Sequence, residues 1–186
     1  MEAVFLILVG AALFSQSWHI LGLYADGRTM AVYVGGLGLL SLAAIMFDTM
    51  LIDGVGDRAI TPADHLAELT VMKALIAVWA LYSIGVAAQA LWDFEERAIG
   101  FYSAFLTVTT GVAFLYFATT LEPRYSDGVW LGLSAATLLL TIMSAMMFFA
   151  LGFTFTVLRS VAGWFLLLGG GVVGVIGLAI AARAIS

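Results

Sequence analysis

The sequence contains no cysteine and few charged residues, and both absences narrow what the chain can be. Without cysteine there is no disulfide bond, no thiolate metal site and no cysteine nucleophile. Charged residues make up 10% of the 186 residues, the net charge is −5, and no basic cluster occurs. We therefore expect neither a nucleic-acid partner nor a patch for anionic lipids.

Signatures of catalysis are absent as well. The sequence has no HExxH motif, no phosphate-binding loop, no serine nucleophile motif and no pair of carboxylates within an apolar run. Because each of these chemistries needs its residue types at a set spacing, their absence argues against an enzyme. We expect no catalytic residue, no metal site and no cofactor.

Hydrophobic residues are what the sequence has in excess. They make up 63% of the chain and the mean hydropathy is +1.12, which leaves too little polar surface for a soluble domain. A membrane-spanning helix needs about 20 mostly apolar residues. The sequence predicts an all-α integral membrane protein, a six-transmembrane-helix bundle that forms one domain over residues 1–186, with both termini on one side of the bilayer. We expect helices over about residues 3–24, 30–51, 62–92, 98–121, 129–151 and 161–182.

Polar residues cluster in the first of these runs, within the stretch LFSQSWHILG. On a helix Ser15, Gln16 and His19 share one face, whereas Ser17 and Trp18 are turned partly away from it. A His or Gln that faces lipid is costly, so this face must meet other helices or water. Two interpretations remain open: hydrogen bonds between helices, or the lining of a polar path.

Other runs carry hydroxyl, amide and aromatic groups but almost no charge. Tyr82 and Gln89 are seven residues apart and therefore share a stripe of the third helix. Asp48 is the exception, and we interpret it as snorkelling to the interface or forming a local pair. This pattern favours a small neutral hydrogen-bonding solute over an ion. We expect DFEER, residues 93–97, to be a solvated loop and the last helix break to fall at Arg159 and Ser160.

Glycines recur at helix-packing spacing in two of the runs. Gly170 and Gly174 lie in a GxxxG spacing near the end of the chain, and VGGLG, residues 34–38, is similar but less regular. Small residues let helix backbones approach closely. The spacing predicts close helix contacts, either within one chain or between copies of it.

Two motifs resemble the AmiS/UreI family of urea and amide channels. The first is LVGAALFSQSWHILGLYADGRTMAV, residues 8–32, in which Gln16 stands where the family has an amide asparagine. The second is LYSIGVAAQALWDFEERAIGFYSAF, residues 81–105, in which Tyr82 matches a pore tyrosine. The resemblance implies six-helix protomers in a hexameric ring, each enclosing its own pore, in the plasma membrane with the termini outside. The residues expected along the solute path are Gln16, His19, Tyr82, Ser15, Trp18, Phe101 and Tyr102.

The sequence also departs from this family. The fifth run, residues 137–147, lacks the tryptophans that constrict the urea channels, and Gly169 stands at the position of a pore glutamate. His65 is the only histidine of the long polar segment, so acid gating is not expected. Three functions remain open: a passive channel for urea or a short amide, a non-transporting membrane subunit, or a transporter of ammonia, a gas or a proton-coupled solute through His19.

Overall fold

Six long helices make up the protein in a computed structural model that describes residues 2–23, 26–54, 63–122, 128–153 and 155–185. The side chains of residues 48–54, 63–68 and 156 are not described, so the expectations for Asp48 and His65 lie outside the described side chains. The helices are α1 (Glu2–Ile20), α2 (Gly27–Gly54), α3 (Ala63–Trp92), α4 (Glu96–Tyr116), α6 (Gly128–Met147) and α7 (Thr156–Ala181). Short π-helical turns extend two of them, η2 (Phe117–Leu121) after α4 and η3 (Phe148–Gly152) after α6.

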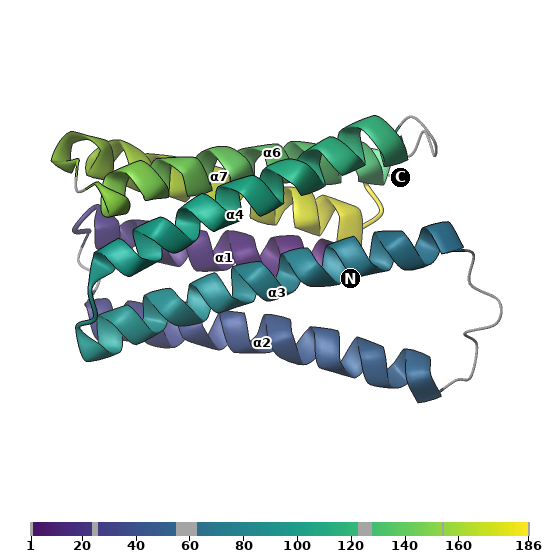
Figure 1. Ribbon diagram of the computed structural model, residues 1–186, viewed down its shortest axis with the longest axis horizontal. Helices are drawn as coiled ribbons and strands as arrows, with labels where there is room; N and C mark the ends of the chain where they lie inside the picture. Colours follow the sequence, from purple (N-terminus) through teal and green to yellow (C-terminus); the bar gives the residue numbers. More distant parts are fainter. Residues whose placement is uncertain (1, 24–25, 55–62, 123–127, 154, 186) are drawn as a thin grey trace.

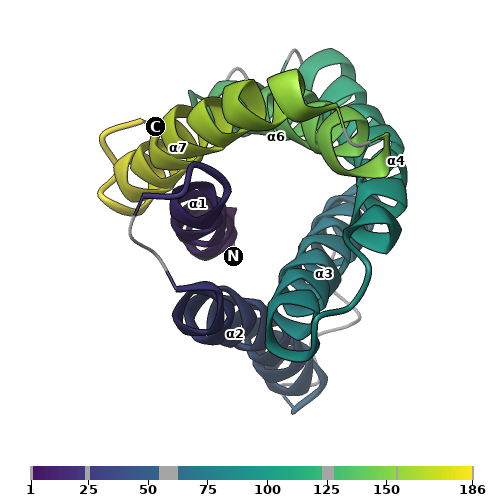
Figure 2. The ribbon, with the colours of Figure 1, turned by 90° about the vertical axis from the view of Figure 1, so that its left-hand side faces the viewer.

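The helices stand side by side in a ring, which Figure 2 shows from one end. Helix α1 lies between α7 and α2, and the ring continues through α3, α4 and α6. Successive helices run in opposite directions, so the two chain ends lie at the same end of the bundle (Figure 1). This arrangement brings the carboxyl ends of α1 and α3 together with the amino ends of α4 and α7.

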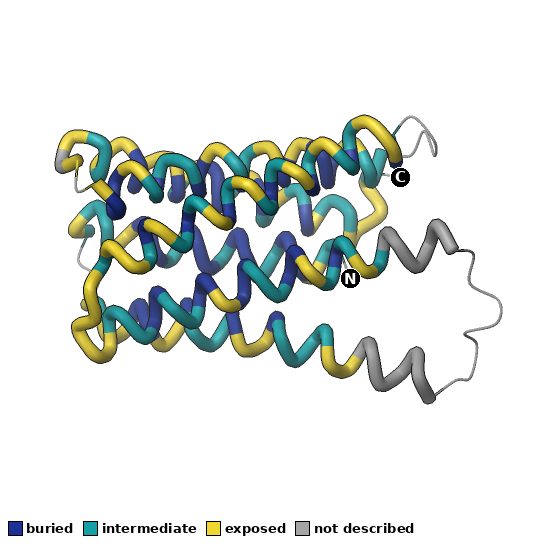
Figure 3. Tube along the Cα trace, in the orientation of Figure 1, coloured by how far each residue is buried: buried dark blue, intermediate teal, exposed yellow. Residues whose placement is uncertain are grey.

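Figure 3 shows exposed and buried residues alternating along each helix, and many of the exposed residues are hydrophobic. Large hydrophobic side chains such as Val32, Leu39, Val108 and Leu131 are more than half exposed. All six helices are long and apolar enough to cross a membrane. Because such a surface is favourable in lipid and costly in water, the chain is a multi-pass membrane protein.

The contact between α1 and α7 depends on glycine. A Cβ atom added to Gly10 would lie 2.6 Å from both the carbonyl oxygen of Gly170 and the backbone nitrogen of Gly174. No side chain fits there, so the two backbones touch directly. The predicted GxxxG contact of the last helix is therefore a contact within one chain.

Two helix ends near the start of the chain differ from the expected ones. Helix α1 ends at Ile20 rather than residue 24, because Gly22 adopts a left-handed conformation (φ 68°). The N–H of Gly22 bonds to the His19 carbonyl and that of Leu23 to the Trp18 carbonyl, which is a Schellman motif. Helix α2 begins at Gly27 rather than residue 30, because the Asp26 carboxylate accepts the Thr29 N–H as an N-cap.

The break between the last two helices also differs. It falls after η3, at residues 153–155, and Arg159 lies inside α7 rather than in the break. Gly152 ends η3 directly against Gly100 of α4, where a Cβ on Gly100 would clash with the Gly152 backbone. The expected loop 93–97 is also shorter, because α4 already begins at Glu96.

Candidate functional site

A buried hydrogen-bonded pair joins α1 to α3 inside the ring. The Gln16 side chain places Nε2 3.0 Å and Oε1 3.3 Å from the hydroxyl oxygen of Tyr82. The hydroxyl can therefore accept from the amide nitrogen and donate to the amide oxygen. Gln16 is 4% exposed and Tyr82 is 3% exposed, so neither side chain reaches the outer surface.

The helix sequences explain why these two side chains meet. Gln16 falls on the same face of α1 as the buried Leu13 and Val9, which turns its amide inward. Tyr82 lies on the buried face of α3 with Trp79, and the two rings meet edge to face at 5.6 Å. An amide buried among apolar side chains needs a partner, and Tyr82 supplies it.

Further polar side chains cross between helices deeper in the ring. The Trp79 indole N–H donates to the Thr110 hydroxyl of α4 at 3.1 Å. The Thr107 hydroxyl lies 3.1 Å from that of Ser144 on α6. The buried Ser134 hydroxyl of α6 has no hydrogen-bond partner among the described residues. Polar groups thus continue inward from the Gln16–Tyr82 pair along α4 and α6.

A small cavity lined by both polar and apolar side chains leads to Gln16 from the end of the bundle where α1 and α3 finish. Its volume is about 20 Å³, enough for one water molecule. Arg159 of α7 donates a hydrogen bond to Glu96 of α4 at 3.0 Å, and both side chains line the cavity. We call this cavity the mouth, and it is lined by Gln16, His19, Ile20, Met30, Val86, Gln89, Glu96, Ile99, Leu151 and Arg159.

Methionines fill the α6 side of the ring. Met143 and Met147 are almost fully buried, as is Leu140. The Met143 sulfur packs against Gly169 of α7, where an added Cβ would lie only 2.6 Å from it. These flexible side chains lie in the tryptophan-free stretch 137–147 of α6.

Several residues expected along the path lie elsewhere. Ser15 donates to the Ala11 carbonyl of its own helix and, with Trp18, lines a separate cleft of about 450 Å³ between α1 and α2. Trp18 and Phe101 are exposed on the outer surface (41% and 58%). Successive helix residues are turned by about 100°, so Ser15 faces α2 although the next residue, Gln16, faces the inside of the ring.

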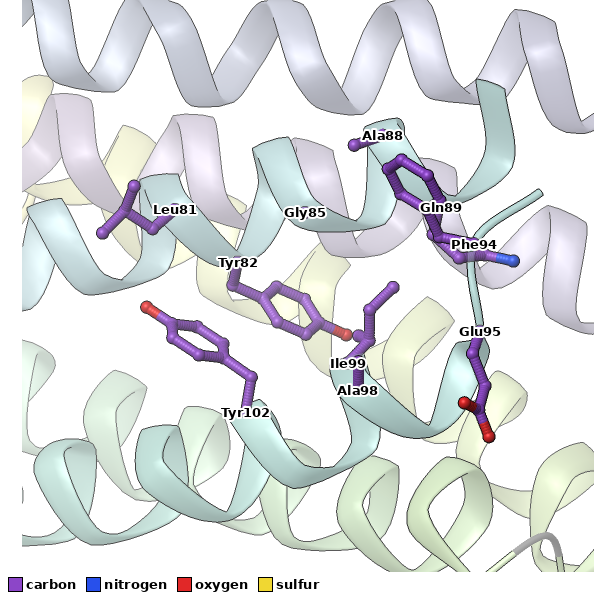
Figure 4. Close-up of a pocket in the computed structure, with 10 residues that line it drawn as sticks. All are labelled: Leu81, Tyr82, Gly85, Ala88, Gln89, Phe94, Glu95, Ala98, Ile99 and Tyr102. Atoms are coloured by element: carbon purple, nitrogen blue, oxygen red, sulfur yellow. The ribbon is translucent and has the colours of Figure 1, made fainter. Parts of the chain in front are cut away.

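Tyr102 lies in a second cleft, which opens sideways between α3 and α4 and measures about 280 Å³ (Figure 4). Its ring stacks on that of Tyr82 at 6.5 Å, and its hydroxyl donates to the Val78 carbonyl. Tyr82, Gln89 and Ile99 line or flank both this lateral cleft and the inner path. The structure thus brings together Gln16, His19, Tyr82 and, from the side, Tyr102.

Sequence reasoning missed three of the residues that shape this site. Glu96 and Arg159 were assigned to breaks between helices, yet they form the ion pair at the mouth. Thr110 was one of many threonines, and no periodicity distinguishes it from Thr109, which bonds only to its own helix. Among the described residues no group of His, Asp and Glu could hold a metal ion.

Comparison with known proteins gives one clear result. The sequence matches no protein-family model and no curated protein. The structure, however, is similar over the full length of both chains to the urea channel of Helicobacter pylori. The closed-state cryo-EM structure of that channel gives a TM-score of 0.79 at 15% identity, and its crystal structure gives 0.74 at 16%. The chain therefore has the fold of that channel.

Proposed function

We propose that the protein is a passive channel for small neutral planar solutes that carry both a carbonyl and an N–H group, such as urea or a short-chain amide. The observation that carries the proposal is the buried Gln16–Tyr82 pair. An amide and a hydroxyl that donate and accept at one point match the groups of such a solute. The fold similarity to a urea channel supports the same solute class.

Passage through the pair would be an exchange of hydrogen bonds. A urea molecule that separates Gln16 from Tyr82 gives each of them back one donor and one acceptor. The net cost is small, because every buried polar group keeps a partner. An ion would instead lose its hydration among neutral side chains, which is far more costly.

The mouth fits this proposal by its charge and its width. Glu96 and Arg159 neutralise each other, so the mouth attracts neither cations nor anions strongly. Its volume of about 20 Å³ is smaller than a urea molecule. A solute therefore has to displace side chains, and His19 and Gln89 border the same space.

We also propose the assembly and setting of the channel. The motif resemblance supports a hexameric ring in the plasma membrane with the termini outside, and the apolar outer faces of the helices leave room for contacts between copies. Cross-linking in vesicles followed by mass measurement would give the number of copies. A monomer in lipid at all protein concentrations would contradict the ring.

Stopped-flow light scattering on proteoliposomes tests the function. We expect urea and acetamide to enter faster than into empty liposomes, and glycerol to enter at the background rate. Gln16→Leu and Tyr82→Phe each remove one side of the pair and should slow urea about tenfold, as the loss of one hydrogen bond of about 1.4 kcal/mol predicts. Tyr33→Phe is the matched control, since Tyr33 is an exposed residue of α2.

Three results would contradict the proposal. Urea entry equal to that of empty liposomes, with folded and inserted protein, would favour a non-transporting membrane subunit. Fast urea entry that neither Gln16→Leu nor Tyr82→Phe alters would place the path elsewhere. A rate that depends on pH and is lost in His19→Ala would indicate coupling to a proton.

A further inference from the structure

The lateral cleft between α3 and α4 has a shape that the proposed channel does not need. Its lining includes Leu81 and Phe94, which are 53% and 59% exposed, so it opens toward the outside of the ring. The other lining residues that the argument uses are Tyr82, Gly85, Glu95 and Tyr102. Gly85 forms part of its floor, where an added Cβ would meet no atom within 4 Å. Figure 4 shows the Tyr82 and Tyr102 rings alongside each other within the cleft and Phe94 and Glu95 at its other end.

The cleft extends over about one leaflet of a bilayer. Leu81 lies eleven residues before the end of α3 at Trp92, which is about 16 Å along the helix axis. The hydrocarbon core of a bilayer is about 30 Å thick, so one leaflet contributes about 15 Å. The cleft therefore reaches from the membrane boundary to about the bilayer centre.

The deep part of the cleft offers no free hydrogen-bonding group among its tyrosines. The Tyr82 hydroxyl is bonded to Gln16 and the Tyr102 hydroxyl donates to the Val78 carbonyl. The remaining deep residues, Leu81 and Gly85, are apolar or without a side chain. An occupant gains there only by burying hydrocarbon.

At the outer end of the cleft lies Glu95, and Arg97 neighbours it from outside the lining. The Glu95 carboxylate lies 3.6 Å from Nε of Arg97, and both side chains are well exposed. A carboxylate accepts hydrogen bonds from a primary ammonium, and a guanidinium donates them to a phosphate. Together they complement the two charges of a zwitterionic phospholipid headgroup.

We propose that the lateral cleft binds one acyl chain of a phospholipid that carries a primary ammonium, with its headgroup on Glu95 and Arg97. The charge order, the apolar depth and the one-leaflet length are each matched by this class of lipid. An apolar side chain or helix of a second copy could fill the deep apolar part of the cleft, but it would not bind the charges of Glu95 and Arg97. Phosphatidylethanolamine is the simplest lipid of the class.

Photolabelling in vesicles tests the proposal without depending on solute permeation. The protein is reconstituted with phosphatidylethanolamine that carries a photoreactive group on its acyl chain, and the labelled residues are mapped by mass spectrometry. We expect label on the cleft residues of α3 and α4 above the level on other outward-facing helices. Gly85→Leu fills the cleft and should reduce this label about tenfold, whereas Gly36→Leu, at an equally open site on α2, should not.

Changing the headgroup separates a bound lipid from surrounding lipid. Photoreactive phosphatidylcholine, which lacks N–H donors, and Glu95→Gln should both lower the label, and Arg97→Gln should lower it for phosphatidylethanolamine. Equal label on all outer helices, unaffected by Gly85→Leu, would show ordinary bulk lipid and overturn the proposal. So would a cross-link between two chains through the cleft. Urea entry is measured separately in the same vesicles. The channel proposal is judged by that rate and the lipid proposal by the label, so one can fail without the other.

Discussion

Two seams of the ring, α1 with α7 and α3 with α4, are built in opposite ways. At the first, backbone meets backbone, and a Cβ on Gly10 would lie 2.6 Å from atoms of α7. At the second, a Cβ on Gly85 meets nothing, and the helices are joined by side-chain hydrogen bonds, Trp79 to Thr110 and Tyr102 to the Val78 carbonyl. The first seam depends on shape, whereas the second depends on a few polar groups.

This difference indicates where the bundle can adjust. A backbone contact has no side chain that can rotate, so we expect α1 and α7 to move as one unit. The α3–α4 seam can change its width as long as its hydrogen bonds survive or find new partners. The Gln16–Tyr82 pair connects the two regions, because Gln16 belongs to α1, a helix of the tight seam, and Tyr82 to α3, a helix of the open one.

The largest effect is expected at the tight seam. Gly10→Ala should lower the free energy of unfolding by about 3 kcal/mol, because overpacking against backbone cannot be relieved by a rotamer change. Thermal unfolding in detergent measures it. Gly171→Ala is the control, since a Cβ there meets nothing within 4 Å. Equal melting temperatures for Gly10→Ala and Gly171→Ala would remove the distinction between the seams.

The next effect is expected from the deeper bond of the open seam. Thr110→Val keeps the side-chain shape but leaves the buried Trp79 N–H unpaired, which should cost about 1–3 kcal/mol. Thr109→Val is the control, because the Thr109 hydroxyl bonds only within α4. The indole fluorescence of the protein and its thermal unfolding report the change. A loss as large in Thr109→Val would show that the cross-helix bond has no special role.

A smaller effect is expected from the outer bond of the same seam. Tyr102→Phe removes the bond to the Val78 carbonyl and should cost about 0.6 kcal/mol, the average for hydrogen bonds between membrane helices. Amide hydrogen exchange in α3 and α4 should become measurably faster, whereas the melting temperature should fall only slightly. No change in exchange beyond that in Tyr33→Phe would mean that the bond does not hold the seam.

The smallest effect has the opposite sign. Gly85→Ala should raise the free energy of unfolding by about 0.4 kcal/mol, because alanine favours the helix and its Cβ meets open space. The comparison with Gly10→Ala then holds the substitution constant and changes only the seam. A destabilised Gly85→Ala would mean that the open seam is as closely packed as the tight one.

The sequence predicted the fold well because lipid imposes strict length and polarity limits on a helix. The six apolar runs and the all-α class are confirmed by the structure and its similarity to a urea channel. The helix ends were less accurate. Gly22 and Asp26 are recognisable cap residues, but they lay inside a stretch where hydrophobicity alone set the expected boundary.

The site was only partly predictable. Gln16 and Tyr82 stood out because a buried amide or phenol must find a partner, and the structure pairs them. Which residues meet across the ring could not be read from spacing within one helix. Glu96 and Arg159 come from separate helices 63 residues apart, and Trp18 and Phe101 face outward because of helix rotations that the ring alone determines.

Gly169 controls the space available to Met143, although it has no side chain of its own. The Met143 sulfur rests against it, so position 169 sets how far that thioether must bend toward the axis of the ring. The series Gly169→Ala, Gly169→Ser and Gly169→Val would place side chains of increasing size against the Met143 thioether. The position of a buried thioether inside the ring would thus be adjusted through a residue that itself has no side chain.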